Sequence, residues 1–298
     1  MRVAIAGGSG FIGSALTKAL LDRKDEVWII SRSGPKERQP SGMRHVTWEE
    51  LEKTPVLLDG MDAIVNLAGE TINQRWSAAA KRRVMESRIS AASRIAKLVE
   101  SLRHKPSVVV NASGISAYGI SADGLFDESS KTAVTDFLSE VVQKWEQAAD
   151  AIPAERLVKL RVGVVLDKKG GAFPLMALPY RMFGGGRIGS GKQWLSWIHL
   201  EDIVRLILFC LDNGEIRGPV NASAPDPATN DTFGRAIGKA MYRPHWFPVP
   251  AFAMRLLLGE MSTLLLDGQR AVPRKALEHG FVFHYPTLDE AMKELAGR

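Results

Sequence analysis

Residues 2–13 read RVAIAGGSGFIG, a short apolar run followed at once by closely spaced glycines. The apolar run, Arg2–Ala6, predicts a buried strand. A helix is expected directly after the glycines, because apolar residues recur there at helical spacing, at Ile12, Ala15, Leu16, Ala19 and Leu20. A strand, a glycine-rich turn and a helix in this order favour a nucleotide-binding α/β fold.

The glycines follow the pattern G-x-x-G-x-x-G, formed by Gly7, Gly10 and Gly13. At such a junction one glycine permits the tight turn, one lets the backbone approach a pyrophosphate, and one allows close packing of helix against strand. The helix N-terminus then offers free N–H groups and a positive dipole end to the phosphates. A glycine triplet alone also fits a plain turn, but a second strand follows here at Glu26–Ser31. We therefore expect dinucleotide contacts from Gly7, Ser9, Gly10, Phe11, Ile12 and Gly13.

Beyond this opening unit, short apolar strands alternate with amphipathic helices. Residues Ser33–Gly42, rich in proline, glycine and charge, predict a loop. Strands are predicted at Asp62–Leu67, Ser107–Ala112, Arg156–Leu166 and Pro219–Ala222, and helices at Ser77–Leu102, Asp136–Ala149 and Leu200–Leu211. Such alternation is typical of a parallel sheet covered by helices on both faces. The predicted fold class is therefore α/β, a Rossmann doubly wound parallel sheet with a smaller, mainly helical C-terminal lobe.

The regular alternation of strands and helices ends near residue 166. We place a dinucleotide-binding Rossmann domain at residues 1–225, within which residues 167–198 contribute to a substrate lobe. Residues 226–298 are expected to form the mainly helical C-terminal lobe, where helical segments are interrupted by Pro244, Pro248, Pro250 and Pro273.

The composition is that of a soluble globular protein, with 45% hydrophobic and 24% charged residues. No apolar run reaches the roughly 18 residues that a membrane span requires, and the N-terminus does not resemble a signal peptide. The single cysteine, Cys210, lies in an apolar stretch, and we expect it to be a core residue of a cytoplasmic protein without disulfides or bound metal. The net charge of +6 is spread along the chain. We therefore expect a small-molecule substrate that carries an anionic group, rather than nucleic acid or a membrane, as the partner.

The end of the second predicted strand bears on the choice between NAD and NADP. An NAD-specific site places an acid there, on the adenosine ribose. This chain has Ser31-Arg32-Ser33, and an arginine flanked by hydroxyls suits a 2′-phosphate instead. The alternative is that Arg32 merely covers the sheet edge, but the pattern favours NADP.

Several motifs resemble those of extended short-chain dehydrogenases/reductases. The loop Gly7–Gly13 resembles their phosphate loop, Asn66–Gly69 (NLAG) their fourth-strand motif, and Trp197–Asp202 (WIHLED) the segment in which their chain returns to the sheet. Two later motifs, Gly189–Gly191 (GSG) and Leu257–Met261 (LLGEM), are similar to an atypical subgroup, the nucleoside-diphosphate-sugar epimerase-like proteins, which carry a C-terminal domain of unknown function. The resemblance covers nearly the whole chain.

The resemblance implies that Leu67, Ala68 and Gly69 pass beneath the adenosine and pyrophosphate of the cofactor. We count Glu70 and Val165 among the expected cofactor contacts as well. Arg88 can be argued from the residues alone, because it lies on the apolar stripe of its helix and a charge there needs a partner. A cofactor phosphate or ribose would supply that partner, and so would Glu70. The third alternative is a snorkelling side chain.

Short-chain dehydrogenases use a serine, a tyrosine and a lysine four residues after the tyrosine, which lowers the tyrosine pKa. Ser113 matches the serine, since it ends a predicted strand beside the expected nicotinamide. The chain contains no Tyr-x-x-x-Lys, because the positions four after its tyrosines hold Ala122, Gly184, Trp246 and Asp289. Tyr118 is therefore either an alternative acid/base or a wall of the pocket.

The segment 186–192 reads GRIGSGK and imitates a triphosphate-binding loop, but Gln193 stands where that loop needs serine or threonine. We interpret it as a loop over the substrate side, with Lys192 available to an anionic group. Trp194 and Trp197 either line this pocket or pack between the lobes. His199 is assigned to the same pocket, with a structural hydrogen bond at a helix start as its alternative.

Two functions follow from these observations. The first is an NADP(H)-binding oxidoreductase or epimerase of the short-chain dehydrogenase type with an altered acid/base. The second is a non-catalytic NADP(H)-binding protein, in which the nucleotide is a structural or sensing ligand. The missing Tyr–Lys pair favours the second function, whereas Ser113 and the glycine-rich loop favour the first.

Overall fold

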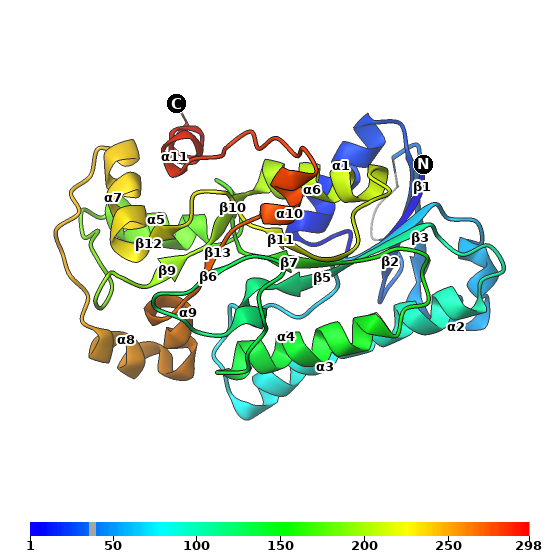
Figure 1. Ribbon diagram of the computed structural model, residues 1–298, viewed down its shortest axis with the longest axis horizontal. Helices are drawn as coiled ribbons and strands as arrows, with labels where there is room; N and C mark the ends of the chain where they lie inside the picture. The colour runs from blue at the N-terminus through cyan, green and yellow to red at the C-terminus, as the bar shows by residue number, and fades with distance from the viewer. Residues whose placement is uncertain (36–39, 298) are drawn as a thin grey trace.

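The computed structural model describes residues 1–35 and 40–297. Within these residues the main sheet has seven parallel strands in the order β11-β7-β5-β4-β1-β2-β3 (Figure 1). They are β1 (Arg2–Ala6), β2 (Glu26–Ser31), β3 (Met43–Thr47), β4 (Ala63–Asn66), β5 (Val108–Gly114), β7 (Leu157–Val162) and β11 (Gly218–Ala222). The strand order reverses between β1 and β4, and sheets of this kind bind ligands outside the carboxyl ends of the strands at such a switch point. The predicted fold class is confirmed.

Helices cover both faces of the sheet (Figure 1). Helices α1 (Phe11–Asp22) and α6 (Leu200–Asp212) contact each other on one face, and α3 (Ala78–Ser101) packs with α4 (Phe137–Asp150) on the other. The alternation along β1 explains the two cores. Val3 and Ile5 pack with residues of α1 and α6, whereas Ala4 and Ala6 pack with residues of α3 and α4. Cys210 is fully buried in the first core, as expected.

The predicted strand Arg156–Leu166 is wrong in one respect, because the chain leaves the main sheet at Gly163. Strand β7 ends at Val162, and β8 (Val164–Leu166) pairs instead with β10 (Trp197–His199) in a separate two-stranded sheet. A Cβ on Gly163 would lie 2.6 Å from the carbonyl oxygen of Ser196. Gly163 therefore allows its own backbone and that of Ser196 to approach closely where the chain passes from the main sheet to the pair of strands β8 and β10.

The segment between Gly42 and Asp62 contains a strand, a helix and the 3-10 turn η1 (Pro55–Leu58), which the sequence analysis does not predict. Met43–Thr47 forms the edge strand β3, in which the polar residues Arg44 and His45 interrupt the apolar run. Helix α2 (Trp48–Lys53) follows, and a capping box between Thr47 and Glu50 begins it. Of the loop predicted at Ser33–Gly42, residues 36–39 lie outside the described residues.

The C-terminal region is helical, as predicted. Its helices are α7 (Asn230–Met241), α8 (Ala251–Leu258), η3 (Gly259–Ser262), α9 (Thr263–Leu266), α10 (Arg274–Glu278) and α11 (Leu288–Leu295). Helices α7 and α11 pack with α5 (Phe173–Arg181) around a third core. By contrast, Phe281 and Phe283 pack into the first core, with residues of α1 and α6.

Short elements complete the described chain. The strands β6 (Leu125–Phe126) and β13 (Arg270–Ala271) pair with each other, as do β9 (Trp194–Leu195) and β12 (Ala228–Thr229). Two single turns of 3-10 helix are η1 (Pro55–Leu58) and η2 (Ile115–Tyr118). Among the residues that the structure describes, no helix is both long and apolar enough to cross a membrane.

Candidate functional site

The turn between β1 and α1 can be built only from glycines at two positions. Gly7 has φ +81°, in the left-handed region, and a Cβ there would lie 2.8 Å from the carbonyl carbon of Leu67. A Cβ on Gly13 would lie 2.2 Å from the carbonyl oxygen of Gly7. The first turn of α1 therefore packs directly on the loop, and the loop lies directly against the end of β4.

The N-terminus of α1 is open to a ligand. Gly10 is its N-cap and has no side chain that could accept a hydrogen bond from the first turn. Ser9 and Gly10 are exposed, while Phe11 and Ile12 are partly buried. Free backbone N–H groups and the positive end of the helix dipole meet at this surface, which is the arrangement that binds phosphate. The residues present therefore fit a dinucleotide pyrophosphate.

Arg88 organises the segment that follows β4. Its side chain lies against Gly69, and its Nη1 donates hydrogen bonds to the carbonyl oxygens of Glu70 at 2.9 Å and Val84 at 3.0 Å. The guanidinium also lies over the ring of Trp145, 5.2 Å from its centroid. Burial lowers the pKa of Arg88 to about 10, although the charge of Glu70 partly offsets this effect. Arg88 thus has partners within the protein, and its contact with a cofactor stays a prediction.

Two further predicted cofactor contacts lie near the loop. Arg32 is exposed one residue beyond β2, and Ser31 Oγ donates a 2.5 Å hydrogen bond to the carbonyl oxygen of Ser33. Val165 is buried in β8, and the loop after β8 lies against the phosphate loop, since a Cβ on Gly170 would lie 2.6 Å from the Phe11 ring. The structure therefore brings segments that are far apart in the sequence to one edge of the sheet.

Ser113 belongs to a buried polar row that crosses three strands. Ser113 on β5 is the register partner of Arg161 on β7, and Arg161 is the partner of Asn221 on β11. Ser113 Oγ donates a 2.7 Å hydrogen bond to Glu146 Oε1, which lies on α4. Arg161 binds the same carboxylate through Nε at 2.8 Å and Nη2 at 2.9 Å. The Ser113 hydroxyl is therefore held by an ion pair rather than directed at open solvent.

Tyr118 is also held inside the protein. Its hydroxyl donates a 2.8 Å hydrogen bond to Asn221 Oδ1, and its side chain is only 2% exposed. The guanidinium of Arg161 lies over its ring, 5.0 Å from the centroid. Burial raises the pKa of Tyr118 above the ordinary value of 10, and the positive charge of Arg161 offsets this only in part. At neutral pH this tyrosine is a poor base.

Electrostatics hold the ion pair charged despite its burial. Burial opposes ionisation of Glu146, but the hydrogen bonds and charge of Arg161 outweigh it and hold the Glu146 pKa below its ordinary value. The same partner raises the pKa of Arg161. Lys159 Nζ lies 3.7 Å from the same carboxylate. A cavity of about 320 Å³ borders the pair, and its lining includes Ala117, Ser139, Gln143, Glu146, Lys159 and Arg161.

The predicted substrate-pocket residues do not all reach a pocket. Trp197 is a correction, because its side chain is fully buried in the third core and its Nε1 donates to the carbonyl oxygen of Asp226 at 2.8 Å. Trp194 is half-buried, and its Nε1 donates to the carbonyl oxygen of Ala122 at 2.9 Å, with Arg270 over its ring. Lys192 is exposed. Of the two tryptophans, only Trp194 has a surface that could line a pocket.

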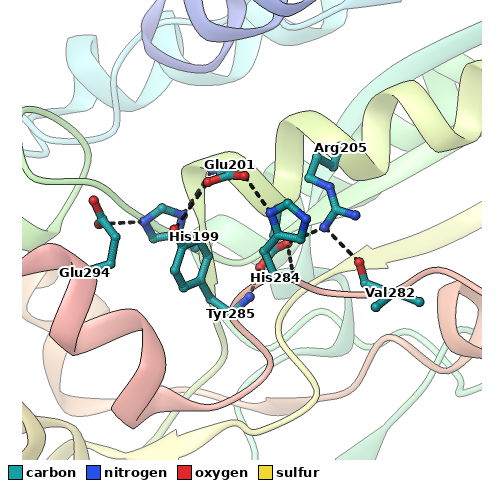
Figure 2. Close-up of polar contacts among 8 residues, drawn as sticks. His199, Glu201, Arg205, Val282, His284, Tyr285 and Glu294 are labelled. Carbon is teal, nitrogen blue, oxygen red and sulfur yellow. Dashed lines mark hydrogen bonds and ion pairs between the residues drawn. The ribbon is translucent and has the colours of Figure 1, made fainter.

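His199 is a second correction. It caps α6, because its Nδ1 accepts a hydrogen bond from the backbone N–H of Glu201, and its Nε2 lies 3.1 Å from Glu294 Oε2. Figure 2 shows the ring between Glu294 and Tyr285, with His284 bonded to the other side of Glu201. One ring nitrogen therefore caps α6, and the other joins the start of this helix to Glu294 on α11. The alternative interpretation of His199, as a structural hydrogen-bonding residue, is the correct one.

Sequence patterns do not identify Glu146, Arg161 and Asn221 as site residues. A weak signal exists for the first two, since Arg161 interrupts the apolar strand Leu157–Val162 and Glu146 lies on the buried side of α4. Charges at such positions need partners. Asn221 carries no comparable signal, because its role depends on a residue 103 positions away.

A doubly wound parallel sheet with a glycine cradle at its switch point defines a Rossmann-type nucleotide-binding protein. Residues 3–138 match the NAD dependent epimerase/dehydratase family, and residues 249–295 match a domain of unknown function (DUF1731). The chain is 41% identical over 298 residues to epimerase family protein YfhF of Bacillus subtilis, covering 99% of this chain and 98% of that one. It is 37% identical to the chloroplastic SDR39U1 homolog of Arabidopsis thaliana, covering 99% and 86% of the two chains. The chain therefore belongs to the epimerase family.

Among solved structures, human epimerase family protein SDR39U1, crystallised with NADPH, superposes with a TM-score of 0.90 at 38% identity, covering 99% of each chain. A Bordetella bronchiseptica enzyme, WbmG, solved in complex with NAD, has a TM-score of 0.76 at 17% identity, which shows likeness of fold alone.

Proposed function

We propose that this protein binds NADP(H) across the carboxyl ends of β1, β2 and β4. The observation that carries this proposal is the cradle formed by Gly7 and Gly13 beside the uncapped N-terminus of α1. It is supported by the human relative, which was crystallised with NADPH. An acid that would favour NAD is absent from Ser31-Arg32-Ser33.

Each part of the dinucleotide has residues to hold it. The N–H groups of the Gly7–Gly13 loop would bind the pyrophosphate, and Arg32, in the turn that Ser31 begins, would bind the 2′-phosphate. Leu67–Glu70, held in place by Arg88, would pass beneath the adenosine. When bound, the nicotinamide would donate or accept a hydride.

The proposed reaction class is an atypical oxidoreductase or epimerase acting on a small molecule. Lys192 is exposed and would attract an anionic substrate group. Neither Ser113 nor Tyr118 is well placed to exchange a proton with the substrate, because their hydroxyls both donate to buried acceptors. A substrate would have to displace one of these hydrogen bonds, or exchange its proton with water, for the reaction to proceed. Neither nucleic acid nor a membrane is proposed as a partner.

The buried hydrogen bonds of Ser113 and Tyr118 also favour a second candidate function. If neither hydroxyl is released, the protein is a non-catalytic NADP(H)-binding protein whose nucleotide is a structural or sensing ligand. The two functions make opposite predictions about NADPH oxidation.

The test is to incubate the purified protein with NADPH and a panel of carbonyl compounds and to follow the loss of reduced nicotinamide. Ser113→Ala and Tyr118→Phe serve as controls, and mass spectrometry of copurifying small molecules narrows the panel. Turnover that falls in either variant supports the oxidoreductase. Tight NADPH binding without turnover on any compound supports the non-catalytic protein, and absence of dinucleotide binding overturns both.

A further inference from the structure

His45 lies directly behind the turn proposed to bind the 2′-phosphate. It is part of the edge strand β3, which runs parallel to β2 with Ser31 opposite Thr47 and Ile29 opposite His45. Its Nε2 lies 3.1 Å from Ser31 Oγ. His45 therefore contacts the residue that begins the Ser31-Arg32-Ser33 turn.

The hydrogen bonds at Ser31 determine which nitrogen of His45 carries the proton. A serine hydroxyl has one proton, and Ser31 Oγ donates it to the carbonyl oxygen of Ser33, which can only accept. The hydroxyl must then accept from His45, so the ring carries its proton on Nε2. The other nitrogen, Nδ1, is buried and has no hydrogen-bond partner among the described residues. A buried unsatisfied nitrogen is uncommon and calls for an explanation.

Burial and one acidic side chain act in opposite directions on His45 when no ligand is bound. Burial lowers the pKa of His45 below its ordinary value of 6.5, while the negative charge of Glu50 on α2 acts in the opposite direction. Arg44 alternates to the other face of β3, where it pairs with Glu26 and lies over Trp28. Among the described residues Glu50 is the only acid that raises the pKa of His45. Because burial outweighs it, the ring is neutral at pH 7.

We propose that His45 is a specificity-determining residue that couples recognition of the 2′-phosphate to uptake of a proton at Nδ1. A dianionic phosphate held by Arg32 places negative charge beside Ser31, whose hydroxyl accepts a hydrogen bond from the ring. Negative charge at that distance favours the imidazolium form. The added positive charge in turn strengthens binding of NADPH, while NADH, which lacks the phosphate, gains nothing. This inference rests on the NADP(H) preference proposed above.

The linkage has a definite sign. If NADPH raises the pKa of His45, binding takes up protons between the free and the bound pKa values, and NADPH affinity rises as the pH falls through that interval. A rise of about one unit corresponds to about a tenfold gain in affinity. The 2′-phosphate itself titrates near pH 6, but this contribution is common to all variants of the protein.

The experiment is calorimetric titration of NADPH and NADH into wild type, His45→Gln and His45→Ala. Each titration is repeated between about pH 5.5 and 8.5, around the ordinary histidine pKa, in buffers of different ionisation enthalpy. Glutamine keeps a donor to Ser31 but cannot take up a proton, whereas alanine removes both. His104→Gln, at an exposed histidine paired with Asp59, is the matched control. Thermal unfolding without ligand verifies that each variant is folded.

Wild type and His104→Gln are expected to take up more protons with NADPH than His45→Gln does, and none of them should take up protons with NADH. The ratio of NADPH to NADH affinity at low pH should fall about threefold to tenfold in His45→Gln. It should fall further in His45→Ala. Equal proton uptake and an unchanged ratio in His45→Gln overturn the role of His45 while leaving NADP(H) preference intact. Wild type that binds both dinucleotides equally overturns the preference and the inference together.

Discussion

Arg161 grips the carboxylate of Glu146 with two hydrogen bonds, Nε to Oε1 at 2.8 Å and Nη2 to Oε2 at 2.9 Å. Both side chains are almost completely buried, and they join strand β7 to helix α4. The pair also sets the surroundings of the two hydroxyls that sequence patterns single out. Ser113 donates to the carboxylate, and Tyr118 lies under the guanidinium. The chemistry of this edge of the sheet therefore depends on the ion pair.

Glu146→Gln should destabilise the protein strongly. The substitution keeps the size of the side chain but leaves the charge of Arg161 buried without a counter-charge, which costs about 3–5 kcal/mol in the free energy of unfolding. Urea denaturation followed by circular dichroism measures this loss. Glu140→Gln, on the same helix, breaks an exposed pair with Lys144 and should change the free energy by no more than about 0.5 kcal/mol. Equal effects in the two variants would show that the buried pair contributes no more than an exposed one.

The same ion pair predicts how stability depends on pH. The pKa of Glu146 is lower in the folded protein than its ordinary value of 4.5, so the unfolded chain binds this proton more readily. The contribution to stability is complete above the ordinary value and is lost as the pH falls through the lower folded-state pKa. Between about pH 5 and 3, wild type should therefore lose more stability than Glu146→Gln. Parallel pH profiles for the two proteins would contradict this assignment.

Arg32→Asp should weaken NADPH binding and spare NADH. A hydrogen bond between a guanidinium and a phosphate contributes about 1.5–3 kcal/mol, so the loss of NADPH affinity should be at least about tenfold. Calorimetry of both dinucleotides measures the change, with Arg44→Asp as a control for the altered net charge nearby. Equal affinity of the wild-type protein for NADPH and NADH would refute the role of Arg32.

Arg88→Met should keep the fold and reduce dinucleotide affinity. Methionine fills the space beside Gly69 and Trp145 but cannot donate to the carbonyl oxygens of Glu70 and Val84. The segment after β4 would then lose its anchor, at a cost of about 1.5–3 kcal/mol per charged hydrogen bond, shared between stability and binding. Thermal unfolding and NADPH titration separate the two effects. Arg94→Met, on the same helix in an exposed pair with Glu52, is the control. A variant that unfolds while its folded fraction binds normally would make Arg88 purely structural.

Oxidation of simple alcohols and reduction of simple ketones should be slow or absent. General acid–base catalysis contributes about 10²–10⁴-fold to such rates, and Tyr118, with its raised pKa and its bond to Asn221, is poorly suited to supply it. Steady-state assays with NADP or NADPH over a range of substrates give the rate. Robust turnover abolished by Tyr118→Phe would show that the tyrosine leaves its buried bond during catalysis.

Much of the main sheet could be predicted from the sequence because its signals are local. The strands β1 and β2 and the helix α1 lie where apolar periodicity places them. The predicted Rossmann fold class and the family resemblance are likewise confirmed. The edge strand β3 shows no clear alternation in sequence, because exposed Arg44 lies on the same face as buried Val46.

The candidate site likewise has features that local sequence predicts and features that depend on tertiary packing. The glycine cradle is a property of consecutive residues, so the spacing of Gly7, Gly10 and Gly13 suffices to predict a turn at the start of a helix. Trp197 and His199 closely follow the loop at residues 186–192 that is interpreted as covering the substrate side, and this proximity leaves a pocket and a structural role both open. Their burial depends on packing against the C-terminal segment. No local pattern reports that packing.

What the sequence alone determined is the phosphate cradle, because turn, helix start and dipole arise within one short stretch of chain. Only the tertiary structure decided the state of the two hydroxyls. Ser113 meets Glu146 across 33 residues, and Tyr118 meets Asn221 across 103. Parallel strands bring Ser113, Arg161 and Asn221 into register, and α4 and η2 supply Glu146 and Tyr118. Burial then makes each hydrogen bond costly to leave unmade. Whether a hydroxyl has a buried hydrogen-bond partner thus depends on how the sheet and helices pack. The spacing of residues along one strand does not predict it.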